Sequence, residues 1–423
     1  MQLTELSISE LGPMADGICL QGRGRVFVER ALPGDRVRGL VQRDDKGISR
    51  AEIVDMVETS PYRQVPPCVH YDHCGNCTIQ HLQPKHYREW KMATVGDALR
   101  RQNLHPRTWI APVFVGPGGR RRATFSVKLE RGVPVMGYFR RRSQDISDID
   151  ACLIADPRLL KLREVILPYL PKILGKKPAD IFLQLMGDAI DMVITGPVGR
   201  GGEPDDFVQA ALENLLAESS LTRISWRSHE KEPSISLFSK APVTAYFGKL
   251  KVSLPPAAFL QPTAAGEKAL VAAVMAALPV SGHFADLFSG CGTFSGPMLE
   301  RAPVDAYESV ATSVKALGKA GAGSPKPLKV MRRDLFTNPL RRDELNRYNA
   351  IVFDPPRAGA PEQVTLMATA KTRTIIGVSC NPATFARDAR ILCDGGYRLQ
   401  SVQLIDQFHW SHHVEVVGVF SKR

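Results

Sequence analysis

From about residue 255 onward, short apolar runs alternate with helical segments, and this alternation constrains the fold more than any other feature of the chain. The first helix is expected over 264–278, with Thr263 as its N-cap and Pro279 ending it. Candidate strands follow at 283–288, 304–308, 328–331, 350–353, 374–378, 399–404 and 414–420. Strands that alternate with helices in this way indicate a doubly wound, Rossmann-like α/β domain built on a parallel sheet.

The first part of the chain has a different pattern. Residues 1–60 consist of short strand-like runs separated by glycine and proline turns, which predicts a small, OB-like β-barrel. Three prolines between positions 61 and 67 mark the end of this unit. A chain of 423 residues is long enough for two or three domains, so we expect units at 1–60, 61–254 and 255–423.

The segment between these two units is predicted to be a mixed α+β domain. Strand-like runs at 124–129 and 135–139 flank Arg131-Gly132 and predict a hairpin with an arginine triplet beyond each outer end. The spacing of apolar residues predicts an amphipathic helix over 206–218. Further strand-like segments lie at 181–186, 191–195, 222–226 and 235–238.

The chain carries an excess of positive charge, with a formal net charge of +12. Much of this charge lies in arginine runs at 120–122, 140–142, 332–333 and 341–342. A single run usually means only a solvated surface, but several together favour a polyanionic partner, because arginine can contact a phosphate with two hydrogen bonds. The charge therefore predicts nucleic-acid binding.

The chain has no segment that predicts membrane insertion or export. No apolar stretch reaches the roughly 18 residues that a membrane-spanning helix needs. The first residues, Met1-Gln2-Leu3-Thr4-Glu5, lack the basic and then apolar pattern of a signal peptide. We therefore expect a cytoplasmic protein with no membrane partner and no structural disulfides.

A glycine loop follows the first strand of the C-terminal domain. Gly290 and Gly292 lie where a ligand would approach the backbone, although a plain tight turn explains such a pair equally well. Glu308 ends the next strand, where ribose hydroxyls bind in nucleoside-binding sheets, and Asp334 follows the third strand. Either carboxylate alone fits an ordinary loop, but the series favours an adenosyl ligand. Position 295 is serine rather than a third glycine, so S-adenosylmethionine fits better than a dinucleotide.

Two further strand ends carry chemically active groups. Asp354 begins an Asp-Pro-Pro turn after the fourth strand, which is moderately specific for methyltransferases that act on planar bases. Cys380 follows the fifth strand and precedes Asn381-Pro382, which places a thiol at the edge of the sheet where ligands bind. An unpaired cysteine is more often a small buried hydrophobe, so Cys380 gains its interest from the residues before it.

Three more cysteines are clustered in sequence. Cys68, Cys74 and Cys77 have the spacing C-x5-C-x2-C, and Cys152 lies further along the chain. In a cytoplasmic protein such a cluster indicates a metal site rather than a disulfide, and the spacing fits zinc and an iron–sulfur cluster equally well. No role is assigned to the remaining three, which are Cys19, Cys291 and Cys393.

With Asp354-Pro355-Pro356-Arg357, Ser379-Cys380-Asn381-Pro382 and His413-Val414-Glu415 in one chain, the sequence resembles the RNA (uracil-C5)-methyltransferase family. The resemblance covers essentially the whole chain, and its first 60 residues look like a TRAM domain, a small RNA-binding barrel. Phe259-Leu260-Gln261-Pro262-Thr263 resembles the family segment that precedes the cofactor fold. Thr263 and Thr293 stand where the family usually has asparagine.

The resemblance implies a reaction and a role for each residue. Cys380 would add to C6 of uracil and make C5 nucleophilic, Asp354 would orient the ring, and Glu415 would remove the C5 proton after methyl transfer. The lack of a cysteine beside the fourth-strand proline favours uracil over cytosine. The residues expected to bind S-adenosylmethionine are Gln261, Phe288, Gly290, Gly292, Thr293, Glu308, Asp334 and Asp354.

The resemblance also bears on the metal and the substrate. It assigns Cys68, Cys74, Cys77 and Cys152 to a [4Fe–4S] cluster, with zinc as the alternative, and the rRNA branch of the family carries these positions. We therefore expect methylation of 23S rRNA by a monomer without an obligate protein partner. The alternatives are a tRNA uracil methyltransferase, a non-catalytic RNA-binding or ribosome assembly factor, and a base-directed DNA enzyme. The target uridine stays open.

Overall fold

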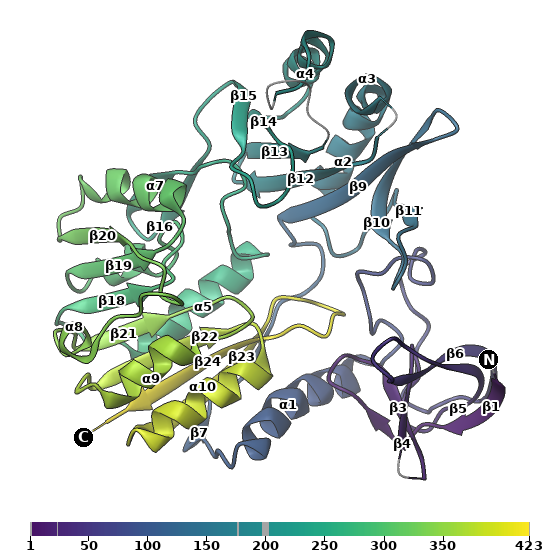
Figure 1. Cartoon of the computed structure of the whole chain (residues 1–423), viewed down its shortest axis with the longest axis horizontal. Helices are drawn as coiled ribbons and strands as arrows, with labels where there is room; N and C mark the ends of the chain where they lie inside the picture. The colour runs from purple at the N-terminus through teal and green to yellow at the C-terminus, as the bar shows by residue number, and fades with distance from the viewer. Residues whose placement is uncertain (1, 23, 176, 197–202, 423) are drawn as a thin grey trace.

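The computed structural model describes residues 2–22, 24–175, 177–196 and 203–422. The chain forms three units, each built on its own main sheet. Figure 1 shows the N-terminal unit at the lower right, the central unit at the top and the C-terminal unit on the left. No helix in the described ranges is long and apolar enough to cross a bilayer.

The C-terminal unit is the predicted doubly wound sheet, and each of its seven expected strands is confirmed. Their order in space is β20 (Leu328–Arg332), β19 (Val304–Glu308), β18 (Phe284–Leu287), β21 (Ala350–Phe353), β22 (Thr374–Ser379), β24 (Glu415–Ser421) and β23 (Arg398–Asp406). Counted along the chain, this order is 3-2-1-4-5-7-6. The first five strands are parallel, and β24 runs antiparallel to β22 and β23.

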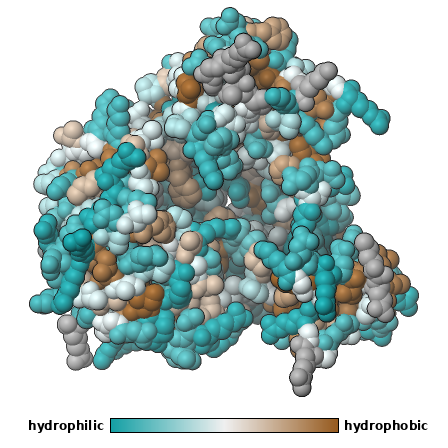
Figure 2. Space-filling model, in the orientation of Figure 1, coloured by the Kyte–Doolittle hydropathy of each residue, from teal (hydrophilic) through white to brown (hydrophobic). Residues whose placement is uncertain are grey.

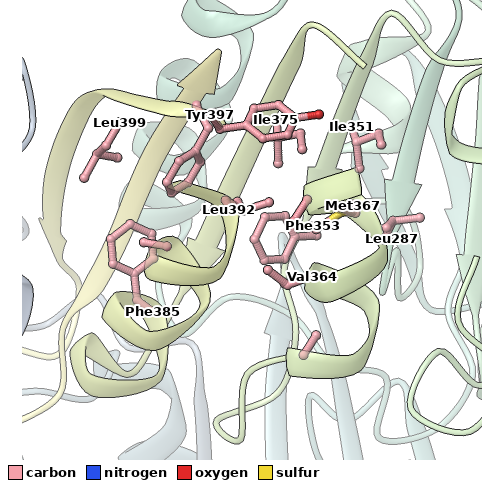
Figure 3. Close-up of a cluster of buried hydrophobic side chains, with 14 of the residues drawn as sticks. Leu287, Ile351, Phe353, Val364, Met367, Ile375, Phe385, Leu392, Tyr397 and Leu399 are labelled. Atoms are coloured by element: carbon pink, nitrogen blue, oxygen red, sulfur yellow. The ribbon is translucent and has the colours of Figure 1, made fainter. Parts of the chain in front are cut away.

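Helices cover both faces of this sheet, which explains why β18 and β21 are buried throughout. The helices are α5 (Ala264–Ala277), α6 (Ser295–Met298), α7 (Ala311–Gly321), α8 (Arg342–Leu345), α9 (Pro361–Thr369) and α10 (Pro382–Asp394). Thr263 caps α5 as predicted, because its side chain accepts a hydrogen bond from the Gly266 N–H. Figure 3 shows how α9 and α10 pack on the sheet: Phe353 and Ile375 from the strands meet Met367 and Phe385 from the helices. This core holds the ends of β21 and β22 rigidly.

One segment expected in the central unit packs on the C-terminal sheet instead. Helix α1 (Pro84–Arg101) lies against α10, and Val95 and Leu99 on α1 join the same apolar core. Strands β7 (Thr108–Trp109) and β8 (Val113–Phe114) then pair with β23. Residues 84–114 thus pack with the C-terminal sheet although they precede residue 255, and the local sequence carries no signal of this because the pairing partner of these short strands is distant in sequence.

The N-terminal sheet has the order β1 (Gln2–Ser7), β5 (Arg36–Arg43), β6 (Ser49–Glu58), β4 (Gly24–Val28), β3 (Gly17–Gln21) and β2 (Glu10–Leu11). Its two outermost strands, β1 and β2, are separated by only Ile8 and Ser9. One nearly continuous segment therefore pairs at both ends of the sheet, so the sheet curls around a small core that includes Leu6 and Val28.

The central sheet has the order β11 (Ile146–Asp148), β10 (Val133–Phe139), β9 (Arg122–Glu130), β12 (Ala179–Met186), β13 (Ala189–Thr195), β14 (Arg223–Arg227) and β15 (Ile235–Ser239). The predicted hairpin is β9–β10, and the predicted helix is α4 (Asp206–Glu218). Helices α2 (Pro157–Ile166) and α3 (Leu170–Leu174) complete this layer. A separate hairpin, β16 (Thr244–Phe247) and β17 (Leu250–Ser253), packs on the C-terminal core.

The arginine triplets partly serve to join the units. Arg141 and Arg142 both pair with Asp16 and Glu29 of the N-terminal unit. These guanidinium groups are therefore partly neutralised by the protein itself rather than wholly available to a polyanion. The face in Figure 2 is mostly hydrophilic and is hollowed at its centre, where the three units meet.

Candidate active site

The glycine loop after β18 lies beside the carboxylate that ends β19. Glu308 accepts hydrogen bonds from the backbone N–H groups of Gly290, Ser309 and Val310 at 2.9, 2.7 and 2.8 Å. The Ser309 hydroxyl also donates to Oε1 at 3.2 Å, whereas Oε2 accepts only from Gly290, so Oε2 keeps one acceptor position for a ligand hydroxyl. This geometry brings Glu308 and Gly290 together as predicted.

The same loop has a backbone that requires glycine. Gly290 has φ +54°, and no protein atom lies within 4 Å of where a Cβ would stand, so the space beside it is open. Gly292 has φ +105°, and a Cβ there would lie 2.6 Å from Leu317. Ser295, which replaces the third glycine, donates to the buried Asp286 at 2.5 Å. The Ser295 hydroxyl therefore has a structural partner. Thr293, in the same loop, is almost fully buried.

An aromatic pair and Asp334 lie at the neighbouring strand end. The rings of Phe288 and Phe336 are 5.6 Å apart, and the Asp334 carboxylate accepts a hydrogen bond from the Phe336 N–H at 2.9 Å. Asp334 is thereby held at the carboxyl end of β20, next to the end of β19. Aromatic faces, carboxylates and an open glycine loop suit an adenosine group, so these residues fit the expected cofactor.

Cys380 lies between β22 and α10 and is partly buried. Asn381 caps α10 through a hydrogen bond from the Ala383 N–H, and its Nδ2 donates to the Arg357 carbonyl at 3.2 Å. Thr384 donates to the same carbonyl at 3.2 Å. The loop that starts at Asp354 and the loop that carries Cys380 are therefore fastened together, and the positive charge of Arg357 lies close enough to the Cys380 thiol to lower its pKa.

Two carboxyl groups share this end of the sheet. Burial is the main cause that raises the pKa of both Asp354 and Glu415, and Asp354 raises that of Glu415 further. Burial, Glu415 and Asp354 also raise the pKa of Cys380 to about 11, whereas Arg357 lowers it. The structure thus brings together the three residues predicted to be catalytic. It surrounds them with a low-dielectric environment in which charge is costly.

Gln261 belongs to the same cluster through a residue that the sequence analysis missed. Buried Gln407 donates from Nε2 to Gln261 Oε1 at 2.7 Å and to Glu415 Oε1 at 3.3 Å. Arg122 was assigned only to a charged run, but it stacks on Phe259 and is close enough to Glu415 for each to alter the other's pKa. Neither residue has a distinctive local pattern, because only the tertiary fold brings it to the strand ends.

The loop between β23 and β24 is tied to α1 by a buried charged cluster. Lys91 donates to Asp406 at 3.0 Å and also to the His413 carbonyl, while Tyr87 donates to Asp406. His413 in turn lies beside Arg357, with 2.7 Å between Arg357 Nη2 and His413 Nε2. In sequence Lys91 looks like an ordinary surface lysine on a helix, so this cluster could not be predicted.

The four predicted metal cysteines line one cavity of about 200 Å³. Burial raises the pKa of Cys77 to about 12, and the neighbouring Cys152, Cys74 and Cys68 raise it as well. Among the described residues, no three Cys, His, Asp or Glu side chains are arranged to hold a single metal ion. The thiols therefore surround a space rather than converge on a point.

The same cavity is in contact with the β23–β24 loop. His409 and Ser411 line it, and the Trp410 carbonyl accepts hydrogen bonds from the Thr78 and Ile79 N–H groups at 2.8 and 3.2 Å. Figure 1 shows this loop in yellow, extending from the C-terminal sheet towards the other units. The loop thus joins the cysteine cavity to the strand ends that hold Glu415.

A sheet of order 3-2-1-4-5-7-6 with a glycine loop after its first strand defines a Rossmann-like methyltransferase. The sequence model described as tRNA (Uracil-5-)-methyltransferase matches residues 331–423. An uncharacterized RNA methyltransferase of Brucella suis is 39% identical over 99% of this chain and 98% of its own length. The chain belongs to the RNA (uracil-C5)-methyltransferase family and is an RNA methyltransferase.

Two further proteins are similar over most of their length. A 23S rRNA (uracil(1939)-C(5))-methyltransferase of Chromohalobacter salexigens is 31% identical over 97% of this chain and 87% of its own length. The crystal structure of a Pyrococcus abyssi tRNA (uracil-54, C5)-methyltransferase with S-adenosyl-L-homocysteine has a TM-score of 0.75. It covers 98% of this chain and 99% of its own chain at 20% identity, a likeness of fold alone.

Proposed function

We propose that the chain transfers a methyl group from S-adenosylmethionine to C5 of a uridine in 23S rRNA, through a covalent bond between Cys380 and C6. The observation that carries this proposal is the convergence of Cys380, Asp354 and Glu415 at one end of the sheet, beside the glycine loop. A non-catalytic RNA-binding factor would have no need for a thiol and two carboxyls held in one buried cluster.

The proposed cofactor site uses groups that remain free in the structure. Gln261 Oε1 accepts a hydrogen bond from Gln407, so Nε2 is the end of Gln261 that can donate to the cofactor. Glu308 keeps acceptor capacity for ribose, and Phe288 offers a ring face. Gly290, Gly292, Thr293, Asp334 and Asp354 complete the proposed set. Bound S-adenosylmethionine would supply an electrophilic methyl group.

In the proposed reaction the Cys380 sulfur adds to C6, and the electron pair moves towards C5 and O4 of the ring. Arg357 assists because its positive charge stabilises the thiolate. Asp354 is placed to orient the uracil ring. Once C5 carries the methyl group, Glu415 takes the C5 proton and the Cys380–C6 bond breaks. Its raised pKa makes Glu415 a better base near neutral pH than a free glutamate.

The rRNA assignment rests on the relative from Chromohalobacter salexigens, because its 31% identity is well above the 20% of the archaeal tRNA enzyme. Purified protein with S-adenosylmethionine is expected to form 5-methyluridine in 23S rRNA from a strain that lacks the modification, measured by nucleoside mass spectrometry. Methylation of tRNA alone would contradict the rRNA assignment. Absence of 5-methyluridine from both RNAs would contradict the proposed reaction.

The cysteine cavity supports a cluster better than zinc. A tetrahedral zinc ion would draw its sulfur ligands to within about 3.8 Å of one another at the usual Zn–S distance. A [4Fe–4S] cluster holds its thiolates farther apart, which fits four thiols that line a cavity of about 200 Å³. We propose that Cys68, Cys74, Cys77 and Cys152 hold such a cluster in a structural role. Broad absorbance near 400 nm, roughly four iron atoms and acid-labile sulfide in anaerobically purified protein are expected; stoichiometric zinc would contradict it.

The N-terminal unit is proposed to contact RNA as a TRAM-like barrel. Its sheet curls because β1 and β2 pair at opposite ends, and its surface carries Arg25, Arg38 and Arg43. A chain lacking residues 1–60 would expose the partners of Asp16, so RNA affinity is better tested by replacing these arginines in the full chain.

A further inference from the structure

One buried carboxamide joins the proposed base to the proposed cofactor contact. Gln407 follows β23 and is 4% exposed. Its Nε2 has two hydrogens, and two acceptors lie in reach: Gln261 Oε1 at 2.7 Å and Glu415 Oε1 at 3.3 Å. Both Nε2 hydrogens thereby have an acceptor, whereas a flipped amide would place its oxygen against Gln261 Oε1, which cannot donate.

Helix α5 packs closely against the Oε1 end of this amide. Gln407 Oε1 is buried and has no hydrogen-bond partner among the described residues. It faces Gly266, where a Cβ would stand 2.3 Å from that oxygen. Any side chain at position 266 would therefore collide with this amide, so Gly266 lets α5 pack closely against Gln407.

We propose that Gln407 is a positioning residue that holds the Glu415 carboxylate and the Gln261 carboxamide in their working orientations at the same time. This inference rests on the proposed function, since it assigns Glu415 to proton removal and Gln261 to the cofactor. The hydrogen bond to Glu415 favours its ionised form, which is the form that accepts the C5 proton. The hydrogen bond to Gln261 occupies Oε1 of that residue and leaves its Nε2 as the donor for the cofactor.

Several charged groups near Glu415 also change its pKa. Asp354 disfavours it, and Arg122 and Arg357 favour it. The Cys380 thiol also faces Glu415, and on α5 Glu267 is engaged by Arg121 at 2.5 Å. Gln407 is the neutral member of this group that can donate to Glu415 without adding charge.

The test replaces Gln407 by leucine, which removes the donor at similar volume. The pKa of Glu415 should rise by about one unit, because one hydrogen bond to a charged group is lost. The acidic limb of the pH–rate profile should therefore move to higher pH by about the same amount. The methylated protein–RNA adduct should accumulate, because its release needs the base, and KM for S-adenosylmethionine should rise several-fold.

A second variant is Gln407→Glu, which is isosteric but lacks the amide donors. It should shift the acidic limb of the pH–rate profile in the same direction.

A matched control is Gln403→Leu, which makes the same change on β23, where Gln403 donates to the Ala111 carbonyl instead. This control should leave the pH profile, adduct level and KM unchanged. An unmoved acidic limb in Gln407→Leu, or an equal shift in Gln403→Leu, would overturn the proposal.

A second readout needs no RNA. The rate of Cys380 alkylation is measured as a function of pH by peptide mass spectrometry. A plot of this rate against pH should show a bend at the pH where Glu415 ionises, because the charge on Glu415 raises the pKa of the thiol. The bend should lie at higher pH in Gln407→Leu. If the wild-type protein forms no 5-methyluridine but the bend moves, the proposed reaction fails while the link between Gln407 and Glu415 stands. If methylation occurs and neither the limb nor the bend moves, only the role of Gln407 fails.

Discussion

The positive charge of Arg357 lies beside the Cys380 thiol and lowers its pKa, whereas burial and the carboxyl groups of Glu415 and Asp354 raise it. Arg357 thus counteracts the effect of the two carboxyl groups on the thiol that has to become a thiolate. Its own position is set by Asn381 and Thr384, which both donate to its carbonyl.

Replacing Arg357 by methionine should therefore slow the attack on C6 by at least about tenfold, because the pKa of Cys380 rises by about one unit or more. Single-turnover kinetics and the alkylation rate of Cys380 should fall together. Arg390→Met serves as the control, since Arg390 lies on the same helix as the Cys380 turn but pairs with Asp394. Loss of turnover with unchanged thiol reactivity would contradict this role.

Replacing Glu415 by glutamine should change the pH dependence of stability. Burial and Asp354 raise the pKa of Glu415, so the folded state binds its proton more tightly than the unfolded state does. The wild-type protein should therefore lose stability relative to Glu415→Gln as pH rises above about 4, by about 1.4 kcal/mol for each unit of pKa difference. Thermal midpoints of both proteins from pH 4 to 9 measure this. Parallel curves would contradict the buried, shifted carboxyl.

Much of the site could be predicted because it depends on strand ends. Asp354, Cys380 and Glu308 each border a buried apolar strand, and parallel strands bring such ends to one edge. The insertion of β24 between β22 and β23 could not be inferred from local pattern, since it depends on long-range pairing. Gln407 follows β23 and is unmarked by any motif, so it acquires its partners only from that topology.

Lys91 should be essential for stability although it takes no part in the proposed chemistry. Lys91→Met leaves Asp406 as a buried carboxylate without its cation, a change that typically costs about 3–5 kcal/mol. The denaturant midpoint of the C-terminal unit, followed by hydrogen exchange of α1 and β23, should fall accordingly. Arg100→Met on the same helix removes an exposed pair with Asp97 and should cost less than about 1 kcal/mol. Equal effects of the two changes would show that the Lys91–Asp406 pair is dispensable.

The bond between Cys380 and C6 can be trapped with RNA that contains 5-fluorouridine. Fluorine at C5 cannot leave as a cation, so Glu415 has no proton to remove and the adduct persists after methyl transfer. The proposed reaction predicts a complex that survives denaturing electrophoresis, requires S-adenosylmethionine for the methylated form, and maps to Cys380 by peptide mass spectrometry. The complex should be absent in Cys380→Ala. No complex with the wild-type protein, or one attached at a different cysteine, would contradict Cys380 as the nucleophile.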